Sequence, residues 1–354
     1  MDKFIIGVMS GTSLDGLDIA YVKFNTNNLS AYKIIEAETI SYSDELVRKL
    51  KDSFHYSGEQ LALLNAEYGI FTGEKISDFI QKYHIKKVDL IASHGQTVFH
   101  RPDLNYTTQI GGGAYINSVT KIKTVSDFRT QDVALGGQGA PLVPIGDLLL
   151  FNQYDYCLNI GGFANVSFDD KQIRKAFDIC PANIVLNHYV NRLGYNYDDK
   201  GKIARKGQLS QKLLDKLNRL EYYTGEQPKS LGWEDVVNYI LPLIDNEQLD
   251  IPDILHTYVE HIALQIAQKI QNGKLLITGG GAYNLYLIER IEALFNGKII
   301  IPDNKTIDYK EALIFALLGL LKDENKINVL ASVTGALFDH SSGVIYDAYH
   351  PKNI

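Results

Sequence analysis

The sequence feature that most constrains the fold is a strand pattern that enters a glycine-containing turn and returns, and it occurs twice. The first copy has an apolar run at 4–9, a polar turn at 10–16 and an alternating stretch at 17–24. The second has an apolar run at 156–160, the pair Gly161-Gly162 and an alternating stretch at 163–168. Apolar runs bounded by turn residues, followed by alternation, predict β-hairpins. The repeat therefore predicts two related halves.

Two further apolar strands, 88–92 and 274–277, also run into glycine-containing segments. Stretches with helical spacing, at 209–220, 253–271 and 283–295, alternate with the strands. In open α/β sheets ligands bind outside the carboxyl ends of strands, and glycine lets the backbone approach a ligand closely. The pattern predicts an α/β fold with a ligand at these strand ends, although glycine also serves simply to make turns.

The length of 354 residues favours two domains. A glycine- and proline-containing interruption at 136–141 precedes the second hairpin, and no low-complexity linker is visible. We expect an N-terminal domain at residues 1–130 and a C-terminal domain at 131–340, and leave open whether the tail beyond Leu330 packs on the first. A cleft between two such domains would close on substrate.

Composition excludes several function classes. The net charge of −7 provides no general basic face for a nucleic-acid backbone. The only cysteines, Cys157 and Cys180, support neither a disulfide framework nor a cysteine zinc site. The N-terminus lacks the features of a secretory signal, and no apolar run approaches the roughly 20 residues of a membrane helix. We expect a cytoplasmic protein without membrane or nucleic-acid partners, and leave a homodimer open.

The first turn has the residue types of a phosphate-binding turn, because flexible backbone N–H groups and two hydroxyls can converge on an anion. Its acidic residues, Asp15 and Asp18, would face a phosphate only through Mg²⁺ or its waters. The same residue types are common in ordinary hairpin turns, so that interpretation stays open. Neither a Walker A motif nor a strand-linked Gly-x-Gly-x-x-Gly is present, which argues against P-loop and dinucleotide-binding folds.

Paired hairpin turns, with a later Gly279-Gly280-Gly281 before a helix, resemble the nucleotide site of the actin, sugar kinase and Hsp70 group. More narrowly, segment 7–18 is similar to the opening motif of the bacterial anhydro-N-acetylmuramic acid kinases. Further segments resemble motifs of that family in the same order: 93–100, 127–129, 137–142, 160–165, 228–230 and 278–282. The resemblance extends from the first strand to Glu311, nearly the whole chain.

This resemblance implies a two-domain actin-like (ribonuclease H-like) ATPase fold with an inter-domain cleft. It implies a kinase that uses ATP and Mg²⁺ in peptidoglycan recycling. Water would open the 1,6-anhydro ring of the amino sugar at C1, while the released O6 takes the γ-phosphate to give N-acetylmuramic acid 6-phosphate. Two alternatives stay open: a kinase or non-catalytic sensor for another amino sugar on the same fold, and an actin-like assembly ATPase.

The resemblance also implies site residues. The ATP-binding residues would be Gly11, Thr12, Ser13, Leu14, Asp15, Gly16, Leu17, Asp18, Asn159, Gly161, Gly162, Gly279, Gly280, Gly281 and Asn284. The substrate-binding residues would be Gln96, Thr97, Asp127, Arg129 and Glu311. A guanidinium fork suits the lactyl carboxylate of muramic acid, and a carboxylate accepts sugar hydroxyls, although a surface ion pair would look the same in sequence. The metal ligands cannot be assigned.

Asp178 falls where the family carries its catalytic aspartate, in a motif usually written Asp-Thr-Gly-Pro-Gly-Asn, and is the candidate general base. Here the motif departs from the family pattern: Ile179 replaces a hydroxyl, Cys180 and Ala182 replace glycines, and Asn187 stands where an acid is commoner. An aspartate before a proline turn is otherwise a common cap or turn residue. The departures put the backbone contacts of this loop to phosphate in question.

Two further predictions concern single residues. Glu311 begins an apolar helix at 312–321, so it is either the family's substrate-contacting glutamate or a first-turn helix stabiliser. His94 and His100 lack acidic or cysteine companions at metal-binding spacing, so we expect them to pack or to form hydrogen bonds.

Overall fold

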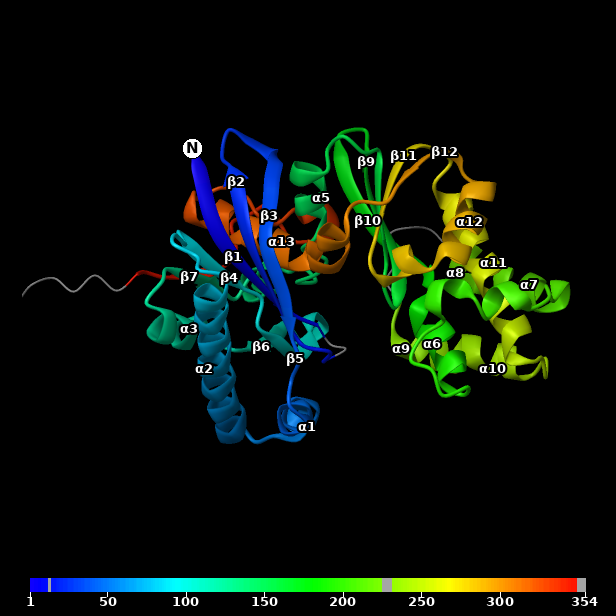
Figure 1. Cartoon of the computed structure of the whole chain (residues 1–354), viewed down its shortest axis with the longest axis horizontal. Coiled ribbons are helices and arrows are strands. Elements are labelled where there is room, and N and C mark those ends of the chain that lie inside the picture. The colour runs from blue at the N-terminus through cyan, green and yellow to red at the C-terminus, as the bar shows by residue number, and fades with distance from the viewer. Residues whose placement is uncertain (12–13, 225–230, 349–354) are drawn as a thin grey trace, which may run out of the picture. The chain divides into compact units, whose positions relative to one another are not determined.

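The computed structural model describes residues 1–11, 14–224 and 231–348, and it is drawn in Figure 1. The chain forms two compact units. Unit 1 combines Met1–Asn152 with the chain from Tyr309 onward, and unit 2 is Gln153–Asp308. The expected boundary after residue 130 therefore differs from this division, because residues 131–152 and the C-terminal segment belong to unit 1. The glycine-containing stretch at 136–141 is a loop inside unit 1, where Gly139 N donates to the buried Asp132 carboxylate over 2.6 Å.

The main sheet of unit 1 has the strand order β13-β7-β4-β1-β2-β3. The hairpin β1–β2 is antiparallel, as is the pair β2–β3, whereas β1, β4 and β7 are parallel. A separate two-stranded sheet joins β5 and β6. The strands are β1 Asp2–Ser10, β2 Leu17–Asn25, β3 Asn28–Ile40, β4 Leu90–Ser93, β5 Gln96–Arg101, β6 Tyr106–Ile110, β7 Thr124–Ser126 and β13 Val344–Tyr346.

Helices cover both faces of this sheet. Apolar side chains of β1 and β2 share a buried cluster with α2 (Gly58–Lys82) and α3 (Gly113–Thr120). The other face meets α13 (Asn304–Asp323), so closely that a Cβ on Gly7 would lie 1.9 Å from the Ala312 carbonyl oxygen. Glycine at position 7 is thus required for α13 to reach β1. The remaining helices of unit 1 are α1 Asp44–Asp52, α4 Thr130–Ala134, α5 Pro144–Leu150 and α14 Ala331–Thr334.

Unit 2 repeats the same sheet topology with the strand order β10-β9-β8-β11-β12. The hairpin β8–β9 and the pair β9–β10 are antiparallel, and β8, β11 and β12 are parallel. This order matches β3-β2-β1-β4-β7 of unit 1 strand for strand. The strands are β8 Tyr156–Ile160, β9 Phe163–Asp170, β10 Ile173–Pro181, β11 Asn272–Thr278 and β12 Asn296–Ile300. The predictions of an α/β class and of two related halves, each with a leading hairpin, are confirmed.

The core of unit 2 joins this sheet to α6, α7, α11 and α12. The predicted helices are present: α7 Gln211–Asn218 and α12 Leu285–Leu294 are shorter than their sequence patterns, and α11 Ile251–Lys269 has the predicted length but begins earlier. The other helices of the unit are α6 Asn183–Asn191, α8 Glu221–Thr224, α9 Trp233–Asp235 and α10 Leu241–Asp245, with a π-helical turn at Val236–Ile240.

The expected start of the last long helix at Glu311 is wrong. Helix α13 begins at Asn304, where the Thr306 N–H is capped by Asp303 Oδ1 at 3.0 Å, and it bends at Tyr309 (φ −115°, ψ 17°). Its first turns carry the polar sequence 304–310, which has no apolar stripe to signal a helix. Glu311 follows this bend and lies in the first turn of the helical segment after it, so the first-turn explanation for Glu311 stays open. None of the helices in the described part of the chain is long and apolar enough to cross a membrane.

Candidate functional site

The first predicted turn joins β1 to β2. Leu14 has a left-handed φ of 59°, and its N–H donates to the Gly11 carbonyl over 3.2 Å. Gly16 is buried, and a Cβ there would lie 2.6 Å from the Ile40 carbonyl oxygen, so packing against β3 alone requires this glycine. Thr12 and Ser13 lie outside the described residues. The hairpin is confirmed, and its contact with phosphate stays a prediction.

The two acidic residues of this hairpin differ in their surroundings. Asp15 is exposed. Asp18, on β2 next to Leu17, is half-buried, and its Oδ1 accepts a hydrogen bond of 2.6 Å from Thr39 Oγ1 on β3. Asp18 is therefore held in place from the neighbouring strand, whereas no hydrogen bond from another described residue orients the Asp15 side chain.

A polar cluster in unit 1 centres on Arg129, which follows β7. Arg129 Nε donates to His94 Nε2 over 2.8 Å, and Nη1 donates to the Gly139 carbonyl over 2.5 Å. Since Arg129 can only donate, Nε2 of His94 must accept, and its Nδ1 carries the proton and donates to the Gly95 carbonyl at 2.9 Å. Burial, then the Arg129 charge, lowers the pKa of His94 well below its usual value. His94 is thus a neutral hydrogen-bonding residue, as expected.

Arg129 and Glu311 interact electrostatically within this cluster. Burial lowers the pKa of Arg129 to about 10, with Glu311 acting in the opposite direction. Glu311 is exposed by its accessible surface. Desolvation by the surrounding protein raises the pKa of its carboxyl, while the charges of Arg129 and then Lys310 act to lower this pKa. Arg129 stays charged at neutral pH, and part of its fork is already committed to His94 and Gly139.

The other predicted substrate residues lie in the same unit. Gln96 is 4% exposed at the start of β5, and Thr97 beside it is half-buried. Asp127 has a left-handed φ of 59°, and its Oδ1 accepts from the Thr130 N–H at 3.2 Å. Asp127 therefore caps the start of α4, and the function predicted for it stays untested.

In unit 2 the predicted ATP residues gather around the β8–β9 turn. The Asn159 side chain, near the end of β8, is reached by Thr278 Oγ1 at 3.5 Å. Gly279 has a φ of 80°, and a Cβ there would lie 2.7 Å from Asn159 Oδ1. A Cβ on Gly281 would lie 2.2 Å from Ile160 Cγ2. The structure thus packs the Gly279–Gly281 segment directly on the end of β8, and the two glycines are required by this contact.

Gly161 and Gly162 hold the loop that follows Asp178. The Gly162 carbonyl accepts from the N–H groups of Ala182 at 2.7 Å and Ile184 at 3.2 Å, and the Gly161 carbonyl accepts from Asn183 at 3.1 Å. These three N–H groups are therefore used inside unit 2. The sequence put the backbone contacts of this loop to phosphate in question. The hydrogen bonds give a physical reason for this, because these backbone donors already have partners.

The altered motif residues face the core rather than solvent. Ile179 is 1% exposed, and Cys180 and Ala182 are 0% exposed. Burial raises the pKa of the Cys180 thiol, so it is uncharged. Tyr258 Oη donates to the Pro181 carbonyl over 3.1 Å and supports the loop from below. The departures at Ile179, Cys180 and Ala182 are thus substitutions in the core of unit 2.

Asp178 lies on β10, where the register against β9 shifts between Asp178 and Cys180. Its Oδ2 accepts from the Leu231 N–H at 2.9 Å, and its own carbonyl accepts from Tyr222 Oη at 2.5 Å. Burial raises the pKa of Asp178, and the Leu231 N–H opposes the shift. In the described part of the chain, Leu231 N is the one donor that contacts the carboxylate. Among the described residues, the carboxylate is therefore contacted through Oδ2, and its pKa is raised.

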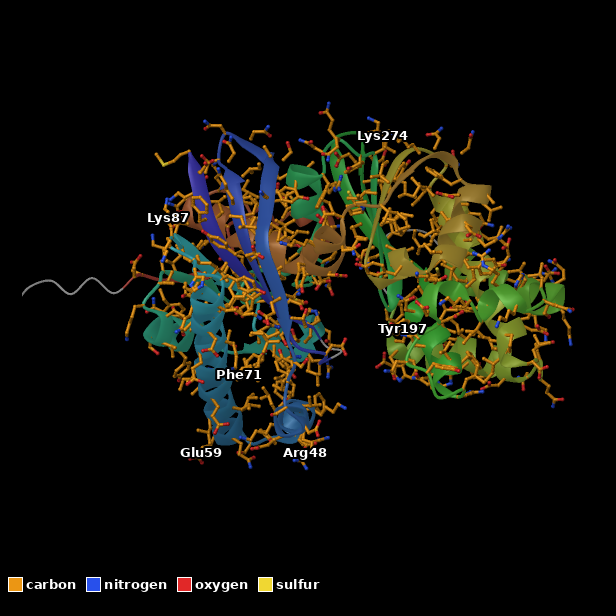
Figure 2. All side chains as sticks on the ribbon, in the orientation of Figure 1. Arg48, Glu59, Phe71, Lys87, Tyr197 and Lys274 are labelled. Carbon is orange, nitrogen blue, oxygen red and sulfur yellow. The ribbon has the colours of Figure 1, made fainter. Side chains whose placement is uncertain are left out.

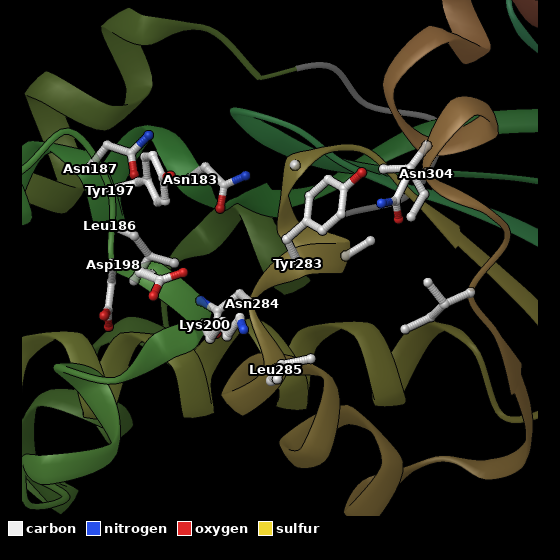
Figure 3. A pocket seen from close by; sticks show the side chains of 15 residues that line it. Asn183, Leu186, Asn187, Tyr197, Asp198, Lys200, Tyr283, Asn284, Leu285 and Asn304 are labelled. Atoms are coloured by element: carbon white, nitrogen blue, oxygen red, sulfur yellow. The ribbon is translucent and has the colours of Figure 1, made fainter.

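A cavity of about 630 Å³ lies within unit 2 beside the Gly279–Gly281 segment (Figure 3). Gly280 and Asn284 line it, and Asn284 Oδ1 accepts from the Leu287 N–H at 3.1 Å, which caps α12. Figure 3 shows Asn187 and Tyr197 at one end and Asn304 at the other. Its volume is in the range of small-molecule sites. It can hold a nucleoside, with the N-terminus of α12 at its edge.

The sequence interpretation missed several residues of this cavity. Tyr197, Lys200, Tyr283 and Asn304 line it but were not predicted. No local motif marks them, because they come from segments about a hundred residues apart. Asn187, noted only as an unusual amide, belongs to the lining as well.

Comparisons with known proteins identify the family of the chain. A family model described as anhydro-N-acetylmuramic acid kinase matches residues 3–348. The anhydro-N-acetylmuramic acid kinase of Crocosphaera subtropica is 34% identical, with 94% of this chain and 96% of that protein covered. The one from Mannheimia succiniciproducens is 33% identical, with 98% and 99% covered. Among solved structures, the (R)-2-hydroxyglutaryl-CoA dehydratase component A of Acidaminococcus fermentans has a TM-score of 0.46 at 14% identity, covering 91% of this chain and 99% of that chain.

Proposed function

The chain belongs to the anhydro-N-acetylmuramic acid kinase family, and from this premise we infer that it phosphorylates 1,6-anhydro-N-acetylmuramic acid with ATP in peptidoglycan recycling. Water adds to C1 of the sugar, the C1–O6 bond breaks, and O6 takes the γ-phosphoryl group. The products are N-acetylmuramic acid 6-phosphate and ADP. The observation that carries this proposal is the family match over residues 3–348, which spans both units and all the proposed site residues.

We propose that Asp178 is the general base that takes the proton of the attacking water. Its raised pKa supports this role, because a base works best when its pKa approaches the operating pH, and in the described part of the chain only one oxygen of the carboxylate has a donor. The Leu231 N–H and the Tyr222 hydroxyl hold the residue from two sides, which limits the orientations of the carboxylate. The burial of Cys180 and Ala182 supports an active loop, since neither side chain protrudes toward solvent.

For the sugar, we propose contacts from Arg129, Glu311, Gln96, Thr97 and Asp127. The charged Arg129 side chain has hydrogens left after its bonds to His94 and Gly139, and these suit the lactyl carboxylate. Glu311, opposite in charge, would accept from sugar hydroxyls.

For the nucleotide, we propose that adenosine occupies the unit 2 cavity, with Asn284 and the start of α12 toward its phosphates. Within the described residues no group of three or more His, Cys, Asp or Glu could hold a metal ion. Mg²⁺ is commonly held by one or two carboxylates together with phosphates. Asp15 and Asp18 are the carboxylates we propose, and the bound ion would neutralise phosphate charge. We further propose that the enzyme acts in the cytoplasm, where ATP is available.

The direct test is incubation of the purified protein with Mg²⁺-ATP and 1,6-anhydro-N-acetylmuramic acid, followed by mass spectrometry of the sugar and measurement of ADP. We expect the 6-phosphate and ADP in equal amounts. Turnover on another amino sugar but not on this one would overturn the substrate. ATP hydrolysis that does not depend on sugar, with sedimentation into filaments, would favour an assembly ATPase.

The base is tested with Asp178→Asn. We expect kcat to fall on the order of 10²-fold or more with ATP affinity retained. Asp215→Asn, an exposed aspartate on α7 of the same unit, is the matched control and is expected to keep its rate. A near-normal rate for Asp178→Asn would show that the base is elsewhere. Tight sugar binding without phosphoryl transfer by the unmodified protein would identify a sensor.

A further inference from the structure

A chain of hydroxyl groups runs behind Gln96 in unit 1. Ser10 Oγ, at the end of β1, donates to Gln96 Oε1. Ser10 Oγ is also bonded to Tyr42 Oη at 2.6 Å, and Tyr42 Oη is bonded to Tyr68 Oη at 2.7 Å. Three hydroxyls thus lead to the Gln96 side-chain amide: Tyr68 on helix α2, Tyr42 after β3, and Ser10 at the end of β1.

The chain of hydroxyl groups is largely buried. Ser10 is 2%, Gln96 4% and Tyr68 1% exposed. Phe71, labelled in Figure 2, stacks on Tyr68 at 6.1 Å between ring centroids and lies 6.1 Å from Tyr42. Burial raises the pKa of Tyr42 and of Tyr68, so both phenols keep their protons. Each hydroxyl therefore has a hydrogen to donate along the chain.

Two contacts determine which way the Gln96 amide faces. Its oxygen receives the Ser10 hydroxyl, and its nitrogen lies 3.4 Å from the Thr97 carbonyl oxygen. A carbonyl oxygen can only accept, so the reverse orientation would place two acceptors together at Thr97. The amide nitrogen carries two hydrogens. Among the residues that the structure describes, Thr97 O is the one acceptor that contacts this nitrogen, which leaves one hydrogen for a ligand.

We propose that Ser10, Tyr42 and Tyr68 are positioning residues that hold Gln96 with its NH₂ group toward the substrate, where it donates to a carbonyl-type oxygen of the sugar. The lactyl carboxylate and the acetamido carbonyl share this chemistry, since both offer oxygens that only accept. The inference rests on the proposed sugar site. Gln96 then selects against analogues that place a donor at this point, because two donors would face each other.

The sharpest test is Gln96→Glu. This variant keeps an oxygen toward Ser10 and replaces the donor by an acceptor of the same size, so the hydroxyl chain survives. We expect the KM for the sugar to rise roughly 10-fold or more, since a buried hydrogen bond is lost and two acceptors meet. The KM for ATP should change less than 2-fold or so. A sugar KM near that of the unmodified enzyme would overturn the proposed orientation.

The positioning role is tested with Tyr42→Phe, which interrupts the chain but leaves Gln96 in place. We expect a rise of roughly 3- to 10-fold in the sugar KM, smaller than for Gln96→Glu, with an unchanged KM for ATP. Tyr115→Phe, a tyrosine on α3 that is 36% exposed, is the control and should behave like the unmodified enzyme. Equal kinetics for Tyr42→Phe and Tyr115→Phe would refute the role of the chain. Thermal melting of each variant separates misfolding from a local effect.

Two sugar analogues distinguish the oxygen that is bound. Inhibition constants are measured for 1,6-anhydro-N-acetylglucosamine, which lacks the lactyl group, and for 1,6-anhydromuramic acid, which lacks the acetyl group. The penalty of Gln96→Glu should disappear for the analogue that lacks the contacted oxygen. A full penalty with both analogues would overturn the proposal. Titration calorimetry with the sugar itself reports the Gln96→Glu effect even if the unmodified protein does not turn the sugar over, so the two proposals fail separately.

Discussion

Cys180→Gly restores a family motif residue next to Asp178, and its effect follows from where the side chain lies. Cys180 is 0% exposed in the core of unit 2 and sits on β10. Asp178 itself is held by the Leu231 N–H and by Tyr222 Oη, and neither contact uses the cysteine side chain. The exchange should therefore change the stability of unit 2 and leave the catalytic geometry in place.

The magnitude is the sum of a packing loss and a backbone cost. Removing the buried CH₂–SH group loses roughly 1–2 kcal/mol of burial and leaves a small cavity. Glycine in a strand costs about 0.5–1 kcal/mol more through the freedom of the unfolded chain. We expect Cys180→Gly to lower the free energy of unfolding by about 1.5–3 kcal/mol, with kcat within roughly 2-fold of the unmodified enzyme, a change that corresponds to about 0.4 kcal/mol in the barrier.

The assay is urea denaturation followed by steady-state kinetics at saturating substrates, below the denaturation midpoint. Cys157→Gly is the matched control, because Cys157 is also buried, at 2% exposure, on strand β8 of the same unit. Both variants should lose similar stability and keep their rates. A loss of stability below about 0.5 kcal/mol would refute the burial argument. A fall in kcat confined to Cys180→Gly would show that this side chain acts in the reaction.

Four further predictions concern Asp178, Gly279 and Lys310. Burial raises the pKa of Asp178, and the base must be ionised to act. As the pH is lowered, kcat should therefore begin to fall above about 3.9, the pKa of an ordinary aspartate. A fall in kcat only at or below that pH would contradict the assignment of Asp178 as the base. Because this pKa is raised, the native state binds the proton more tightly than the unfolded chain does. Asp178→Asn should therefore unfold no more easily than the unmodified protein at pH 7. Any gain in its free energy of unfolding over the unmodified protein should shrink as the pH falls through the raised pKa. Gly279→Ala should weaken ATP binding roughly 10-fold in calorimetry. The reason is that residue 279 has a φ of 80°, and the new Cβ would lie 2.8 Å from the Ile160 carbonyl oxygen. Unchanged ATP affinity would argue against this segment as an ATP contact. Lys310→Ala should lower the free energy of unfolding by about 3–5 kcal/mol in urea denaturation, because it breaks a buried ion pair. The Lys310 ammonium lies 2.7 Å from the Asp147 carboxylate, and both side chains are 5% exposed. A loss below about 1 kcal/mol would refute this prediction.

Local patterns in the sequence were sufficient for the elements around the candidate site. The hairpins at β1–β2 and β8–β9 were predicted because apolar runs, glycine turns and alternation act within about twenty residues. Helix α11 was predicted for the same reason, from a single apolar stripe. The start of α13 was missed, because residues 304–310 are mostly polar and a bend at Tyr309 separates them from the apolar part of the helix.

Family motifs in the sequence also identified the candidate base, Asp178. They showed as well that the loop after it departs from the family pattern, which put its backbone contacts to phosphate in question. Only the tertiary structure decided that Cys180 and Ala182 fill the core and that the N–H groups after Pro181 bond to Gly161 and Gly162. The reason is physical: residue type and spacing determine local conformation, whereas burial and hydrogen-bond partners depend on which distant segments meet.

The same distinction holds for side-chain orientation and for the nucleoside cavity. Ser10, Tyr42, Tyr68 and Gln96 are far apart in the chain, and no periodicity relates them, so the direction of the Gln96 amide exists only once β1, α2 and β5 have packed. The sequence by itself determined two hairpin-led α/β halves and the membership of one family. The tertiary structure decided which polar groups already have partners and which remain for a ligand, because a hydrogen bond requires atoms to meet in space.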